Sequence, residues 1–186
     1  MHLIIISGPQ GTGKTTLGKR LEQEFKLPFF SKDNIKEVIF DTLGWKDREF
    51  SVKVGTTAYG ILYSIIDTML KSGCSLIVES NFLAKYDSKK FIDFKEKYGV
   101  TPFEIQLHCE GNILFKRFKE RSFSQDRHPG HVDTQNFEAY KEVLLKGSSE
   151  SLLVGGEVYL LNTTNLEEIP YEDLSKHIKL YLDRLL

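Results

Sequence analysis

A glycine-rich loop near the start of the chain has the residue types and spacing of a phosphate-binding site. Gly8, Gly13, Lys14 and Thr15 fit the pattern G-x-x-x-x-G-K-[ST], with an apolar run before it and an amphipathic helical pattern after it. Glycines let a loop turn several backbone N–H groups towards one anion, and the positive end of the following helix adds to the attraction. The pattern therefore predicts a nucleotide triphosphate site; a glycine-rich turn beside a solvated lysine is the alternative.

Several positions of this loop have an expected role. Lys14 is a mobile point charge that can reach β- and γ-phosphate oxygens, the Thr15 hydroxyl can ligate Mg²⁺, and Thr16 is expected to meet the α-phosphate. The residues expected to bind the nucleotide here are Gly8, Gln10, Gly11, Thr12, Gly13, Lys14, Thr15 and Thr16.

Two carboxylates follow predicted strands. Asp33 lies where a parallel sheet exposes its ligand-binding edge, so it can accept a proton from a substrate hydroxyl. It could also cap the helix expected to begin at Asn34, and both roles can hold together. Glu79 ends an apolar run beside the phosphate loop, where a group that orients magnesium or water belongs; a solvated strand-end carboxylate is the alternative.

Three arginines lie in or beside a predicted lid at about residues 122–136. Arg117 and Arg121 are four residues apart on one helix face, and Arg127 follows in a segment rich in Ser, Gln, Pro and Gly. Arginines on a closing lid can stabilise a transferring phosphoryl group and exclude water. We expect Arg121 and Arg127 to be catalytic and Arg117 to flank adenine, against the alternative of an ordinary charged helix face. His128 and His131 lack a clear third ligand and make a poor metal site.

The elements that must position these residues alternate between strands and helices, which favours an α/β fold around a parallel sheet. Predicted strands cover residues 3–7, 27–30, 75–79, 103–109 and 158–161. Two helical stripes are expected to face the core: Ala58, Ile61, Leu62, Ile65, Ile66, Met69 and Leu70, and then Tyr171, Leu174, Ile178, Tyr181, Leu182 and Leu185.

Composition narrows the class of protein. The chain has 186 residues, 40% of them hydrophobic, which predicts one domain over residues 1–186. A net charge of −1 gives no whole-surface attraction to nucleic acid or anionic lipid. Two distant cysteines predict neither disulfides nor zinc, and no run is long and apolar enough for a signal peptide or a membrane span. We expect a soluble cytoplasmic protein, either a monomer or a homodimer.

The motifs together resemble one group of enzymes. GPQGTGKTT, SKDNIKE, VESNF, the CEGNILFKRFKERS helix, RHPGH and LLNTTN are similar to the small P-loop kinases, which include the polynucleotide 5′-kinase domain, chloramphenicol phosphotransferase and zeta toxins. The resemblance implies a three-layer fold with a five-stranded parallel sheet in the order 2-3-1-4-5 and ATP as phosphoryl donor. It also implies that Asp33 orients or deprotonates the acceptor hydroxyl, that Arg121 and Arg127 grip phosphates, and that Thr163 and Thr164 line the adenine pocket.

These observations predict an ATP- and Mg²⁺-dependent phosphotransferase acting on a hydroxyl of a small molecule, nucleoside or nucleic-acid end. The guanine-reading N-K-x-D of GTPases is absent. Residues 42–57 are expected to lie over the unidentified acceptor, with Trp45, Lys46 and Arg48 as contacts, although Trp45 could simply be a hydrophobic plug. A nucleotide-binding regulatory or toxin-like protein acting through a protein partner stays open. So does a nucleic-acid repair 5′-kinase, although the charge argues against extended nucleic-acid binding.

Overall fold

The computed structural model describes residues 1–135 and 137–184. The helices are α1 (Lys14–Phe25), α2 (Lys32–Leu43), α3 (Arg48–Lys71), α4 (Ala84–Tyr98), α5 (Gly111–Ser122), α6 (Phe137–Leu145) and α7 (Tyr171–Asp183). The strands are β1 (Leu3–Ser7), β2 (Phe29–Ser31), β3 (Leu76–Glu79), β4 (Phe103–His108) and β5 (Glu157–Asn162). Short 3₁₀ turns span Pro129–His131, Asp133–Gln135 and Leu166–Glu168.

The five strands form one parallel sheet in the order β2-β3-β1-β4-β5, which confirms the expected α/β fold and strand order. Ile6 of β1 pairs with Glu79 on one side and Ile105 on the other. Strands β2 and β3 lie on one side of β1, and β4 and β5, which come later in the sequence, lie on the other side. The carboxyl end of β1 therefore lies where the strand order reverses, which is the usual ligand site of an open α/β sheet.

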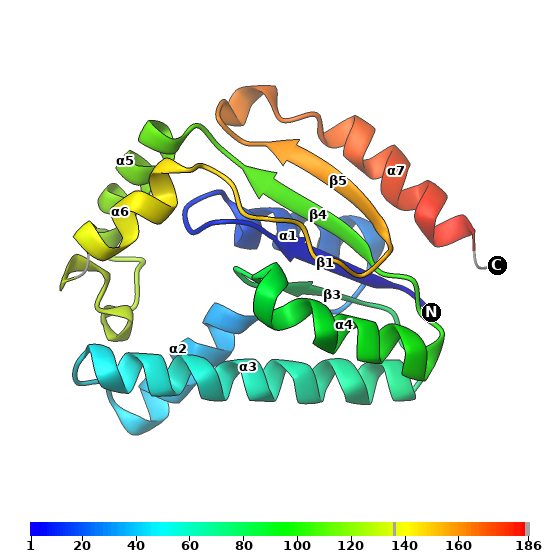
Figure 1. Cartoon of the computed structure of the whole chain (residues 1–186), viewed down its shortest axis with the longest axis horizontal. Coiled ribbons are helices and arrows are strands. Elements are labelled where there is room, and N and C mark those ends of the chain that lie inside the picture. Colours follow the sequence, from blue (N-terminus) through cyan, green and yellow to red (C-terminus); the bar gives the residue numbers. More distant parts are fainter. Residues whose placement is uncertain (136, 185–186) are drawn as a thin grey trace.

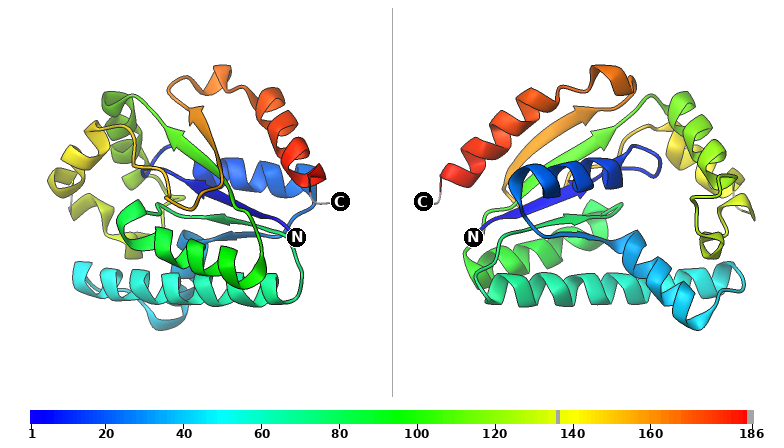
Figure 2. Two further views of the ribbon diagram at one scale, coloured as in Figure 1. Left: turned by 45° about the vertical axis from the view of Figure 1, so that its right-hand side comes forward. Right: turned by 180° about the vertical axis from the view of Figure 1, so that it is seen from behind.

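Alternating side chains of β1 build two separate halves of the core. Leu3 and Ile5 pack with buried residues of α3 and α4, whereas Ile4 and Ile6 pack with buried residues of α1 and α7. Figures 1 and 2 show α3 and α4 on one face of the sheet and α1 and α7 on the other. Both faces of β1 are covered, which explains why its sequence is a continuous apolar run. The buried strand fixes the start of the loop that follows it.

The two predicted helical stripes are largely confirmed. Ala58, Leu62, Ile66 and Leu70 are buried along α3, but Ile61 is 39% exposed because it lies on the solvent side of that helix. On α7 the buried residues are Leu174, Ile178 and Tyr181, and Leu185 lies outside the described residues. Among the helices that the structure describes, none is long and apolar enough to cross a bilayer.

Helix α3 changes the expected picture of residues 42–57. Asp47 caps this helix by accepting a hydrogen bond from the Phe50 N–H at 2.9 Å, so ten of these residues form its first turns. Residues 44–47 alone connect α2 to α3. Most of this segment is therefore helical, and the helix packs along α2 (Figure 1).

Candidate functional site

The phosphate loop is formed and tightly placed between β1 and α1. Gly8 has φ +130°, and a Cβ at this position would lie 2.4 Å from the Leu107 carbonyl oxygen, so only glycine fits beside β4. Gly13, at φ +90°, is the N-cap of α1. The Lys14 ammonium donates to the Pro9 carbonyl at 2.9 Å and lies 3.9 Å from a Glu79 oxygen. Burial lowers the pKa of Lys14, and the charges of Glu79 and Asp33 partly offset this effect.

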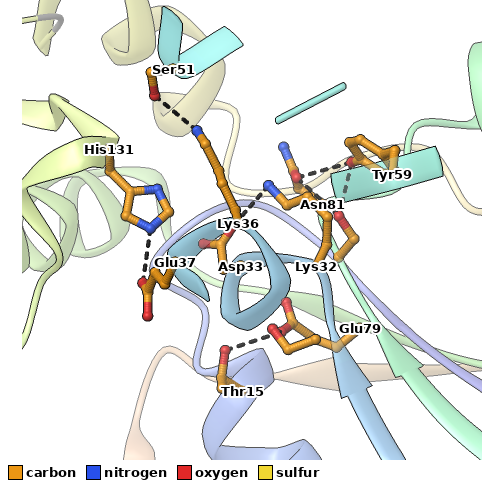
Figure 3. A network of polar contacts seen from close by, with 12 residues as sticks. Thr15, Lys32, Asp33, Lys36, Glu37, Ser51, Tyr59, Glu79, Asn81 and His131 are labelled. Atoms are coloured by element: carbon orange, nitrogen blue, oxygen red, sulfur yellow. Dashed lines mark hydrogen bonds and ion pairs between the residues drawn. The ribbon is translucent and has the colours of Figure 1, made fainter. Parts of the chain in front are cut away.

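Glu79 connects the phosphate loop to β2. Its Oε2 accepts a hydrogen bond from the Thr15 hydroxyl at 3.1 Å (Figure 3). The same oxygen accepts one from the Ser31 hydroxyl at 2.6 Å, and Glu79 is 4% exposed. Mg²⁺ prefers hard oxygen ligands and keeps several of its waters, so one hydroxyl and one carboxylate beside the expected phosphates fit this ion. Bound there, Mg²⁺ would neutralise charge on the β- and γ-phosphates. The predicted pair Thr15 and Glu79 is therefore brought together in a suitable form.

Asp33 lies inside the first turn of α2, and the interpretation of Asp33 as a cap is wrong. The N-cap is Ser31, whose hydroxyl is bonded to Glu79 rather than to the helix. The Asp33 carboxylate instead lies 2.6 Å from the Lys32 ammonium, 3.3 Å from Arg127 and 3.9 Å from Arg121. Burial alone would raise the pKa of Asp33, but the charges of Lys32, His131 and Arg127 outweigh it and hold the pKa well below 3.8. This carboxylate is ionised at neutral pH and is a weak base.

Within the segment predicted to form a lid, residues 127–131 pack against α2. The Arg127 side chain is 7% exposed and donates to Asp133 at 2.7 Å and to Asp33 at 3.3 Å, while His131 Nε2 lies 2.8 Å from a Glu37 oxygen. The His128 ring nitrogen lies 3.1 Å from an Asp41 oxygen. Each histidine thus has a carboxylate partner, and the described residues contain no cluster of three or more His, Cys, Asp or Glu that could hold a metal ion. Residue 136, the last of the expected lid, lies outside the described residues.

One cavity of about 380 Å³ joins the phosphate loop to the face of α2 that carries Asp33. Of the predicted residues, the cavity is lined by Gln10, Gly11, Gly13, Lys14, Thr15, Thr16, Asp33, Arg48, Glu79, Arg121 and Arg127. Trp45 and Lys46 are not among its lining residues. The Trp45 ring meets His128 edge-on at 5.0 Å, and the Lys46 ammonium lies 6.0 Å from the centre of the Phe50 ring.

A second, more apolar cavity of about 240 Å³ lies on the other side of the phosphate loop. Thr12, Leu107, Leu161 and Thr163 are among the residues that line it, together with Arg117. The Arg117 guanidinium donates to the backbone carbonyls of residues 163 and 164 at 2.7 and 2.8 Å, so it fixes this loop. The Thr164 hydroxyl accepts from the Glu110 N–H instead, and Thr164 is not a lining residue. That adenine binds in this cavity stays a prediction.

Sequence reasoning missed Lys36, Glu37, Asn81 and Asp133, which also line the larger cavity. Lys36 and Glu37 lie one helical turn after Asp33 and so share its face of α2. Once Asp33 had been chosen as a candidate site residue, this spacing could have indicated Lys36 and Glu37 from the sequence alone. No comparable sequence pattern marks Asn81 or Asp133, which the folding of separate segments brings to the site.

Comparison with known proteins defines the class to which the chain belongs. A family model described as an AAA domain matches residues 3–146. Together with the sheet order and the phosphate loop, this match shows that the chain is a member of the small P-loop kinase superfamily. Within that class, it belongs to the AAA domain family.

Individual relatives agree with this assignment. The chain is similar to a shikimate kinase from Staphylococcus epidermidis, with 30% identity over 129 residues, 64% of this chain and 65% of that protein. A candidate kinase from Chloroflexus aurantiacus J-10-fl shares 36% identity at a TM-score of 0.85, over 96% of this chain and 97% of that one. A gluconokinase from Sinorhizobium meliloti 1021, 16% identical at a TM-score of 0.55 over 99% and 95% of the two chains, shares the fold.

Proposed function

We propose that this protein transfers the γ-phosphoryl group of ATP, with Mg²⁺, to a hydroxyl group of a small molecule. The observation that carries the proposal is that one cavity is lined both by Lys14 and Thr15 of the phosphate loop and by Asp33, Arg121 and Arg127. A phosphate site alone would serve any nucleotide-binding protein. The Asp33 carboxylate, in the first turn of α2, lines the same cavity and adds a group that can receive an acceptor hydroxyl.

The electrostatics favour orientation by Asp33 over early proton removal. Because its pKa is held well below 3.8, Asp33 accepts a hydrogen bond from the hydroxyl but withdraws little of its proton. Phosphoryl transfer passes through a loose transition state, in which the incoming oxygen needs positioning more than activation. The acceptor oxygen then bonds to the γ-phosphorus, the bond from that phosphorus to the β,γ-bridging oxygen breaks, and ADP leaves. The hydroxyl proton passes to Asp33 or to the new phosphate ester.

The arginines supply charge around the transferring group. Arg127 is anchored by Asp133 at 2.7 Å, so its guanidinium can turn from Asp33 towards phosphoryl oxygens without losing that partner. Arg121, at 3.9 Å from Asp33, lies on the same side of the cavity. Positive charge held in place in a closed site stabilises the equatorial oxygens of the transition state.

The test is a screen of pooled metabolites and nucleosides for an ATP-dependent mass gain of one phosphoryl group. We expect a small hydroxylated product with the wild-type protein, and none with Lys14→Ala at matched thermal stability. A blank screen with intact ATP binding would overturn the proposal and favour a nucleotide-binding regulator. Salt-sensitive binding of single-stranded oligonucleotides, with a phosphorylated 5′ end as the product, would instead indicate a nucleic-acid kinase.

A further inference from the structure

Lys36 differs from the other buried cations around the larger cavity. The ammonium of Lys32 has Asp33, and the Arg127 guanidinium has Asp33 and Asp133. Lys36 is 6% exposed and lines the same cavity, yet its hydrogen bond goes to a neutral group, the Ser51 hydroxyl of α3 at 2.9 Å (Figure 3). Within residues 1–135 and 137–184, no carboxylate lies at ion-pair distance from its ammonium.

A buried ammonium without a counter-charge is costly, and this one still has hydrogen-bonding capacity. An ammonium has three N–H donors, and the Ser51 hydroxyl accepts one of them. Gly55 of α3 lies close to this side chain, because a Cβ at that position would be in van der Waals contact with the Lys36 ammonium at 3.7 Å. The pKa of Lys36 is lowered to about 8, mainly by burial; the charges of Lys32, Arg127 and Arg48 act in the same direction and Asp33 in the opposite one.

Arg48 is a second cation that lines the cavity, and it is half-buried. It is the first residue of α3 and lines the cavity, and its guanidinium lies over the Tyr140 ring at 5.2 Å from the ring centre. In the part of the chain that the structure describes, Arg48 forms no ion pair. The nearby carboxylates are already engaged: Glu37 with His131, and Asp133 with Arg127.

We infer that the phosphoryl acceptor carries an anionic group, a carboxylate or a phosphate, in addition to its hydroxyl, and that the Lys36 ammonium and the Arg48 guanidinium bind this group. The inference rests on the proposed function. Asp33 and Lys36 are three residues apart on α2, so their Cβ atoms are about 5–6 Å apart on one face of the helix. A small hydroxylated anion can therefore meet Asp33 with its hydroxyl and Lys36 with its charge.

The test uses matched compounds that differ in the anionic group. Gluconate and glucitol, glycerate and glycerol, and glucose 6-phosphate and glucose are assayed for ATP-dependent product formation and ADP release. Charge-assisted hydrogen bonds of this kind are worth about 10- to 100-fold in affinity. We expect at least one anionic member to be preferred by about that factor in kcat/KM, and Lys36→Met to remove the preference through KM. The carboxylate and phosphate arms distinguish the two kinds of anion.

The control separates binding from folding. Lys89 on α4 is an exposed lysine outside the cavity, so Lys89→Met should change neither the preference nor the Tm. Lys36→Met should keep or raise the Tm, because it removes an unpaired buried charge; a clear fall in Tm together with an unchanged preference would show that Lys36 only joins α2 to α3. Turnover of neutral compounds at equal kcat/KM would overturn the inference and leave the kinase proposal standing.

If no compound is turned over, the inference is tested by binding. The same six compounds are titrated calorimetrically into the protein loaded with a non-hydrolysable ATP analogue. Binding of an anionic compound that is lost in Lys36→Met supports the inference. No anion binding that depends on Lys36 overturns it, whereas binding of the ATP analogue itself tests the nucleotide site separately.

Discussion

Replacing Asp33 with Asn would remove the charge that we assign to orienting the acceptor and leave the shape of the side chain. Positioning and proton-accepting groups of this kind are worth about 10²- to 10⁴-fold in rate, or roughly 3–5 kcal/mol of barrier. We expect kcat to fall by that factor. The ATP affinity should change by less than about threefold, because Asp33 is assigned to the acceptor and makes no hydrogen bond or ion pair with the described residues of the phosphate loop.

The structure also predicts a cost in stability, which a capping role would not have given, because Asn caps helices well. Breaking a fully buried ion pair costs about 3–5 kcal/mol and an exposed one about 0–1 kcal/mol. The Asp33 side chain is 28% exposed, and Arg127 keeps Asp133 as a partner, so we expect about 1–2 kcal/mol. For a domain of this size that is a fall in Tm of about 2–8 °C.

Acid titration gives an independent check of the same ion pairs. The folded-state pKa of Asp33 lies well below the unfolded value of 3.8, so its contribution is fully present above that pH and is lost as the pH falls towards the folded pKa. The stability difference between the wild type and Asp33→Asn should therefore shrink as the pH is lowered through that range.

The assay is a comparison of turnover, ATP affinity and Tm between Asp33→Asn and Asp93→Asn, an exposed carboxylate of α4 that pairs with Lys89. The Asp93 variant should match the wild type in all three. Turnover of Asp33→Asn within about threefold of wild type would refute the assignment, since the loss of a group that positions the attacking oxygen costs about 10²-fold.

Four other perturbations test other parts of the site. Lys14→Ala should lower both ATP affinity and kcat, the latter by about 10²- to 10³-fold in a steady-state assay; unchanged affinity would mean that the loop does not hold the phosphates. Glu79→Gln should raise the Mg²⁺ concentration needed for half-maximal turnover by about 10- to 100-fold, with near-normal ATP binding. Gly8→Ala should cost about 2–4 kcal/mol in urea unfolding, because its Cβ would clash with the Leu107 carbonyl; a smaller effect would show that β4 can move. For an anionic acceptor, kcat/KM should fall above pH about 8 as Lys36 loses its proton, and this limb should be absent in Lys36→Met.

The sheet was predictable because each strand carries its own local signal. The apolar run of β1, the glycines after it and the charged helix that follows point to the same structure, and the family resemblance supplied the strand order. Boundaries were less certain. Strand β2 begins at Phe29, two residues later than expected, because Leu27 packs with the core cluster beneath α1 and α7 without joining the sheet.

The acceptor side of the cavity was only partly predictable because its properties come from packing between helices. Lys36 lies in an ordinary polar stretch, and its burial depends on α3 lying against α2. Asp33 was correctly placed near the carboxyl end of β2. Beside the adjacent Lys32, however, the charges that lower its pKa are those of His131 and Arg127, almost a hundred residues away. Local patterns predict the elements and the loop, whereas the charge balance of a cavity depends on which distant segments meet there.

The destination of the γ-phosphoryl group tests the central claim most directly. ATP labelled in that group would be incubated with Mg²⁺, the pooled small molecules and either wild-type protein or Asp33→Asn, and the labelled products separated and identified. We predict label in a phosphate ester of a small hydroxylated compound, formed about 10²- to 10⁴-fold more slowly by the variant. Label found only in inorganic phosphate, at a rate that does not depend on Asp33, would contradict the account.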